Sequence, residues 1–543
     1  MRYSRLLAVG LATAVGLIWS SVFSTQSWAQ TAATATATAS AATASGLTCT
    51  GAAVRNNPPQ PDPLNGQKDP FVGKLFDSGL PTGLLPIDEA ARKFILELGL
   101  PCQEQVSPGG QEKIGLDNLQ RGFDFYSWRT FIALNSPADG SSIDQARADT
   151  RTRWEDMANF KQLLDVMLPA DQLPPKWPAD RPGMESERER LVPAECRDLH
   201  RRMPQRMIVK MIEESFNEPF KTGPLIDQQG HYAIFDILMN RQMFDYITLN
   251  HLNTKAGQAA NSNLAVDFPA GLNSGNGLGA FMLKVSWRIL SDSEIQAKNF
   301  HMVEALVLTP PSPAGARRCL PESLGLIGFH AVHKTASRPQ WIWTSFEHVK
   351  NVPDRDEVAA KKFNGPYNFY SVNCKGACIE NATPPTPWDP DPALELKFRR
   401  DDSFKSQIVR ETPLTNAAKN MNAIFQSMLA NTVWKNYMLI STQWPSNTNN
   451  CTKLQSQKSP LPKTDFLKQP DMTCSPAPTF MANSTLETYS QGDIPLASSS
   501  CIACHSNAVG FQRGASNPPL DSRNSDGPNL NQSDFTFMLE KAQ

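Results

Sequence analysis

The chain has 543 residues, with 52 lysines and arginines against 53 aspartates and glutamates, and a net charge of −1. This balance, without a basic stripe, does not suggest a nucleic-acid partner. The length exceeds that of a small carrier domain and allows two or more domains, and the 43 prolines predict long irregular surface connections.

The N-terminus has the pattern of a secretory signal peptide. Arg2 and Arg5 precede an apolar run over residues 6–19, and a small-x-small cleavage signal ends at Ala29. The run is too short to span a bilayer comfortably, so we expect cleavage after Ala29, with an uncleaved anchor as the alternative. We therefore expect a periplasmic or otherwise exported protein with no transmembrane segment in the mature chain. The Ala- and Thr-rich residues 30–60 are expected to form a flexible linker.

Apolar periodicity near 3.6 residues predicts that the first half of the chain is helical. The strongest of these segments carries aromatic residues at helical spacing and opens at Leu116. The expected helices are 91–98, 116–132, 154–164, 207–216 and 237–252.

The pattern then changes to that of strands. Residues 281–290, 300–308, 324–333 and 341–349 are expected to form one antiparallel sheet, with the last two joined as a hairpin. A long irregular excursion over 354–391 follows. The remaining expected elements are a helix over 416–436, a strand over 437–444, a short helix opened by a capping box at Ser484–Glu487, and a last helix over 535–541.

Three of the eight histidines lie in the hairpin, at His330, His333 and His348. On a strand, His330 and His333 point to opposite faces, so they cannot share one metal ion without a bulge. The simpler interpretation is that all three form hydrogen bonds within the sheet. The alternative is that one of them, or His301 nearby, contributes to a cofactor site.

Cysteine usage agrees with export. Eight cysteines lie outside the motif described next, and an even number is typical of disulfide-bonded proteins of oxidising compartments. Proximity in the sequence favours Cys374–Cys378 and Cys451–Cys474. The other four allow three pairings that spacing does not separate: Cys49, Cys102, Cys196 and Cys319.

Near the C-terminus, residues 501–505 read Cys-Ile-Ala-Cys-His, the pattern C-x-x-C-H. From the cysteine and histidine content, about 0.003 chance matches are expected in this chain. On one helical turn, Cys501, Cys504 and His505 share a face and would converge on one planar ligand. A zinc ribbon would need a second C-x-x-C pair, which the sequence lacks, and a thioredoxin-like pair would need a preceding strand.

The motif resembles the haem-attachment motif of c-type cytochromes. The resemblance covers less than a tenth of the chain, and the rest matches no family that we can name. It implies one covalently attached haem c, with thioether bonds to Cys501 and Cys504 and with His505 as the proximal iron ligand. It also implies electron transfer with a redox donor or acceptor, either a protein or a small molecule.

The second axial position of the iron is open to three interpretations. Single-haem cytochromes usually supply a methionine from the loop after the attachment helix, but residues 506–532 contain neither methionine nor histidine. Met538 could bind instead, although its helical face marks it as core. A methionine or a histidine of the body, such as His330, His333 or His348, is the second interpretation. The third is an open position, which would suit a haem enzyme of peroxidase or oxygenase type, or a sensor.

Together these patterns predict an α+β fold with a mainly helical body, an antiparallel sheet at about 281–349 and a short helical C-terminal haem-bearing segment. The expected divisions are the signal peptide 1–29, the linker 30–60, the body 61–440 and a haem-binding region, 441–543, packed on the body.

Overall fold

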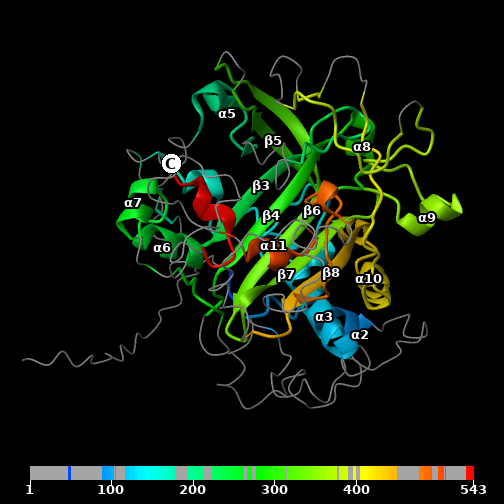
Figure 1. Ribbon diagram of the computed structural model, residues 1–543, viewed down its shortest axis with the longest axis horizontal. Coiled ribbons are helices and arrows are strands. Elements are labelled where there is room, and N and C mark those ends of the chain that lie inside the picture. Colours follow the sequence, from blue (N-terminus) through cyan, green and yellow to red (C-terminus); the bar gives the residue numbers. More distant parts are fainter. Residues whose placement is uncertain are drawn as a thin grey trace, which may run out of the picture. The chain divides into compact units, whose positions relative to one another are not determined.

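A long twisted sheet organises the computed structural model, shown in Figure 1. The described strands are β1 (Phe160–Gln162), β2 (Met207–Lys210), β3 (Ile234–Asn240), β4 (Phe281–Ile289), β5 (Met302–Leu308), β6 (Cys319–Thr335), β7 (Arg338–His348), β8 (Tyr437–Pro445) and β9 (Pro476–Ala477). The structure describes residues 47–49, 89–102, 104, 116–169, 172, 174, 176–177, 192–211, 222–261, 264, 266–271, 277–311, 315–375, 378–388, 396–398, 404–448, 476–491, 499–506, 508 and 533–543.

The nine described strands form one sheet in the order β1-β3-β4-β6-β7-β8-β9, and β5 pairs with the first half of β6 and with β2. All these pairs are antiparallel except β2 with β5. The 17-residue β6 is the central strand, because it pairs with β4, β5 and β7.

Helices cover both faces of this sheet. The α-helices are α2 (Glu89–Leu96), α3 (Leu116–Asn135), α5 (Arg197–Arg202), α6 (Arg241–Leu249), α7 (Lys255–Ala260), α8 (Asp292–Ala297), α9 (Arg355–Ala360), α10 (Asn416–Met428) and α11 (Cys501–His505). Short 3₁₀ helices are η4 (Ile143–Gln145), η5 (Leu163–Asp165), η7 (Ala194–Cys196), η11 (Val433–Asn436), η13 (Thr488–Ser490) and η14 (Phe537–Lys541). None of the described helices is both long and apolar enough to cross a membrane.

The alternation of side chains along β4 separates the two faces. Phe281, Leu283 and Val285 join the large core cluster under α3 and α10, which lie side by side in Figure 1. Met282 lies on the other face and belongs to a second cluster, formed with α6 and the C-terminal segments. We call this second side of the sheet, which also carries Lys284, the motif face, because α11 packs there against β7 and β8.

The expectation of an α+β fold with a mainly helical body is wrong, because the sheet dominates and extends far beyond 281–349. The α-helix predicted over 154–164 is absent; that range contains β1 and the start of the 3₁₀ helix η5. The range 207–216, also predicted as a helix, begins with strand β2. The predicted helix 237–252 is in fact the end of strand β3 followed by helix α6. The change occurs at Asn240, whose side chain accepts a hydrogen bond from the Met243 N–H and caps α6. These short strands are stabilised by partners distant in the sequence, such as β5 for β2, which local periodicity does not reveal.

Other predictions are confirmed. The structure has the four strands predicted within 281–349, the hairpin of β6 and β7, the strand after residue 436 and helix α3. The predicted capping box at Ser484–Glu487 is wrong: the only helix there is η13, which begins after it, and Ser484 donates its hydroxyl hydrogen to Glu347. The last predicted helix is the shorter η14.

Three disulfides are present among the described residues, as expected of a protein of an oxidising compartment. Cys374–Cys378 confirms the prediction from proximity. The four undecided cysteines pair as Cys49–Cys102 and Cys196–Cys319. The proposed Cys451–Cys474 bridge and the signal peptide lie outside the described residues.

Candidate functional site

The C-x-x-C-H motif forms its own short helix, α11, on the motif face. The side-chain oxygen of Gln443 in β8 accepts hydrogen bonds from the Ile502 N–H (2.9 Å) and the Ser500 hydroxyl (3.2 Å). The Ser500 hydroxyl in turn accepts from the Ala503 N–H, which caps the helix N-terminus. The sheet therefore fixes where α11 begins, and the helical spacing places Cys501, Cys504 and His505 on one face of it.

The imidazole of His505 is held in one tautomer. Its Nδ1 lies 2.9 Å from the carbonyl oxygen of Phe535, and since a carbonyl only accepts, Nδ1 carries the hydrogen. The ring packs between Trp343, at a centroid distance of 4.4 Å, and Phe537, at 5.0 Å. Burial lowers the pKa of His505 to about 3, so the ring is neutral. A neutral imidazole with Nδ1–H bonded to a carbonyl presents its Nε2 lone pair, the usual arrangement of a metal-binding histidine.

The motif cysteines differ from the other described cysteines. Cys501 and Cys504 form no disulfide, whereas the other six described cysteines do. Burial, and next to it the nearby Glu487, raises the pKa of Cys504 to about 12 and that of Cys501 well above the usual value. Cys501 and Ile502 are buried in the apolar cluster of the motif face, together with Met538.

The floor beside the motif is formed by β4, β6 and β7. Lys284 and Ser345 flank His330 in register, so these three side chains share one face of the sheet. Burial lowers the pKa of His330 and of His505, and the positive charge of Lys284 lowers both further. The site therefore combines two thiols, two imidazoles and a lysine on one side of the sheet.

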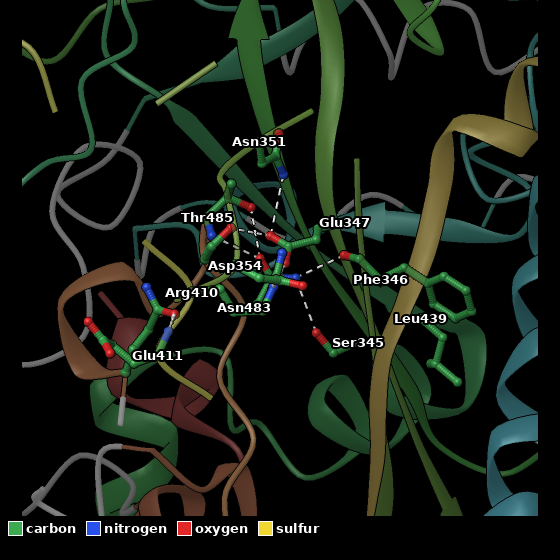
Figure 2. A network of polar contacts seen from close by, with 12 residues as sticks. Ser345, Phe346, Glu347, Asn351, Asp354, Arg410, Glu411, Leu439, Asn483 and Thr485 are labelled. Atoms are coloured by element: carbon green, nitrogen blue, oxygen red, sulfur yellow. Dashed lines mark hydrogen bonds and ion pairs between the residues drawn. The ribbon is translucent and has the colours of Figure 1, made fainter. Parts of the chain in front are cut away.

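The segment before the motif is pinned to the same floor by a buried polar network (Figure 2). Figure 2 shows the Asn483 side chain directed at β7, where its amide donates to the Phe346 carbonyl (2.9 Å) and the Ser345 hydroxyl (3.1 Å). Thr485 exchanges a 2.9 Å hydrogen bond with Ser286 of β4. At the centre of the network, Glu347 forms an ion pair with Arg410, and both side chains are inaccessible to solvent.

This network places Glu487 beside the floor. Its carboxylate accepts a 3.0 Å hydrogen bond from the Asn483 N–H and lies 3.5 Å from Nε2 of His330. After burial, the charge of Glu487 is the largest cause that raises the pKa of Cys501 and of Cys504. The motif, the segment at 483–487 and His330 thus meet in one place.

The structure separates the three hairpin histidines. His333 faces the opposite side from His330, as predicted, and its two ring nitrogens bond to the Tyr126 hydroxyl and the Leu278 carbonyl. His348 lies far along β7, where its nitrogens bond to the Asn299 carbonyl (3.1 Å) and the Lys350 N–H (3.1 Å). Only His330 is brought to the motif.

His301 pairs with Glu155 at 2.6 Å. Its ring packs against Trp287 and Trp434 of the large core cluster, away from the motif face. Met538 lies in the same apolar cluster as Cys501. Among the described residues, no three His, Cys, Asp or Glu side chains are grouped to hold a metal ion by themselves.

Sequence reasoning missed Lys284 and Glu487. The sequence marks Lys284 only weakly: it is a charged residue that interrupts the apolar start of the predicted strand 281–290. The local sequence predicts Glu487 only as part of a helix cap. No residue near it in the sequence indicates that it approaches β6.

Comparison with protein-family models, with curated proteins and with solved structures finds no match to this chain. Function therefore rests on the motif and on its surroundings.

Proposed function

We propose that this protein is an exported monohaem c-type cytochrome that transfers electrons. The observation that carries the proposal is a pair of thiols one helical turn apart that form no disulfide, one buried (Cys501) and one half-buried (Cys504). They lie next to a neutral imidazole whose Nδ1–H is bonded to the Phe535 carbonyl. The residues present fit the group: two thiols for its vinyl substituents, one imidazole for its iron and an apolar cluster around them. When bound, the haem supplies an iron that cycles between Fe(III) and Fe(II).

The chain has four tasks in this function. Cys501 and Cys504 would hold the haem by thioether bonds to its two vinyl groups, with each thiol hydrogen passing to the neighbouring vinyl carbon. His505 would bind the iron through Nε2, and its Nδ1–H bond to the Phe535 carbonyl leaves that Nε2 without a hydrogen. Trp343 and Phe537 pack against the imidazole ring. The apolar cluster that buries Cys501 and Ile502 would lower the local dielectric on that side of the site, which tunes the potential.

The test is covalent haem attachment in the exported protein. The protein should carry peroxidase-active haem stain on a denaturing gel and a mass increase equal to one haem. Cys501→Ser with Cys504→Ser should abolish both, because no thioether can form. Cys374→Ser with Cys378→Ser is the matched control, since it removes a disulfide of a distant loop and should keep the stain. Stain that survives in the first double variant, or its absence in the unmodified protein, would overturn the proposal.

A further inference from the structure

One buried nitrogen on the motif face lacks a hydrogen-bond partner. His330 is 7 % exposed, and its Nε2 makes no hydrogen bond in the structure. The nearest carboxylate oxygen, on Glu487, lies at 3.5 Å, beyond normal hydrogen-bond distance. A buried polar atom without a partner costs about 1–3 kcal/mol, so this position calls for a ligand.

The place of His330 in the sheet points it toward the motif. Trp343, whose ring packs on His505, lies opposite Val332 in the pairing of β6 with β7. Val332 is two residues from His330, so Trp343 and His330 are on the same face of neighbouring strands. The two imidazoles therefore belong to one site, one from α11 and the other from the floor of the sheet.

Other residues are less suited to bind a metal there. Both ring nitrogens of His333 and of His348 already have partners. Met282 and Met538 are buried in the apolar cluster, and packing alone accounts for them. His330 is the described histidine that combines burial, an unpartnered Nε2 and proximity to the motif.

We propose that His330 is the second axial ligand of the haem iron, opposite His505. The inference rests on the proposed function and deepens it. Two histidine ligands fill both axial positions, so the iron is six-coordinate and low-spin, which suits electron transfer and leaves no open position for peroxide or O₂. Glu487, beside the same nitrogen, adds a negative charge that stabilises the ferric state.

The experiment uses the exported protein with haem attached and measures optical absorption and electron paramagnetic resonance in the ferric state. The unmodified protein should be low-spin. His330→Gly should become high-spin while its covalent haem stain is unchanged, and added imidazole should restore the low-spin signal by filling the vacated position. Met282→Leu, a change of similar volume in the same cluster, is the control and should remain low-spin.

A second variant keeps the test decisive if His330→Gly folds poorly. His330→Met offers a thioether in place of imidazole and should stay six-coordinate with a higher reduction potential, since thioether ligands favour Fe(II). A stained His330→Gly protein whose spectrum and resonance signal equal those of the unmodified protein would overturn the assignment, as would a high-spin unmodified protein. Absence of covalent haem from the unmodified protein would instead overturn the proposed function.

Discussion

The buried ion pair between Glu347 and Arg410 gives the sharpest prediction about stability. Arg410 bonds to Glu347 and, at 2.7 Å, to Asp354, and it is 1 % exposed. Burial works to lower the pKa of Arg410, but the charges of Glu347 and Asp354 outweigh it and raise that pKa. Arg410→Met keeps much of the side-chain length and leaves the Glu347 carboxylate buried without its cation.

The expected loss in free energy of unfolding is about 3–5 kcal/mol, the range for removing one partner of a buried pair. The Glu347 carboxylate, fully buried, would retain only the Ser484 hydroxyl and a 3.4 Å contact with the Asn351 amide. Because Ser484 belongs to the segment that carries Glu487, the same variant should also loosen the site. Adding Glu347→Gln to Arg410→Met should recover part of the loss, since the buried Glu347 charge is then removed and the remaining carboxylate, on Asp354, is 33 % exposed.

Urea denaturation of the purified protein, followed by tryptophan fluorescence, measures this change. Arg355→Met is the matched control, because its side chain is 43 % exposed in its ion pairs with Glu380 and Glu411. Exposed pairs contribute about 0–1 kcal/mol. Equal losses for Arg410→Met and Arg355→Met, or a double variant less stable than Arg410→Met, would refute the reasoning.

Two further predictions concern the sheet. Burial lowers the pKa of His333 from 6.5 to about 4, so the unfolded chain takes up the proton first as pH falls. The contribution of His333 to stability, present in full above pH 6.5, should then decline by about 3 kcal/mol toward pH 4. His333→Gln should flatten this part of a pH series of urea unfolding, and an unchanged slope would contradict the prediction. In Gly328→Ala, the added Cβ would lie 2.3 Å from both Ser286 Oγ and Thr485 Oγ1. Overpacking should cost about 1–3 kcal/mol in thermal or urea unfolding, and a variant as stable as the original protein would show that the segment at Thr485 yields freely.

The sequence predicts the middle of the sheet well, because β4, β6 and β7 are long and rich in apolar and β-branched residues. It fails at the edges, where three- to seven-residue strands such as β1 and β3 depend on pairing rather than on their own pattern. Asn240 illustrates this: it ends β3 and caps α6, yet nothing nearby marks it as a boundary.

The candidate site divides in the same way. Cys501, Cys504 and His505 are recognisable from spacing because all three lie within one helical turn. The sequence identifies His330 as one of three candidate histidines but cannot choose among them, because the choice depends on which segment of the chain covers β6. That cover comes from the segment of Asn483 and Glu487, which Asn483 anchors through hydrogen bonds to β7, more than 130 residues earlier in the chain.

The packing of α3 against β8 has a consequence for how the chain folds. The Thr442 hydroxyl of β8 donates to the carbonyl of Phe123 in α3, across 319 positions of sequence. The aromatic face of α3 therefore stays without its partner until most of the chain has been synthesised, and such distant contacts slow folding. We expect the nascent chain to depend on chaperones, and α11 to dock last, onto a sheet already assembled.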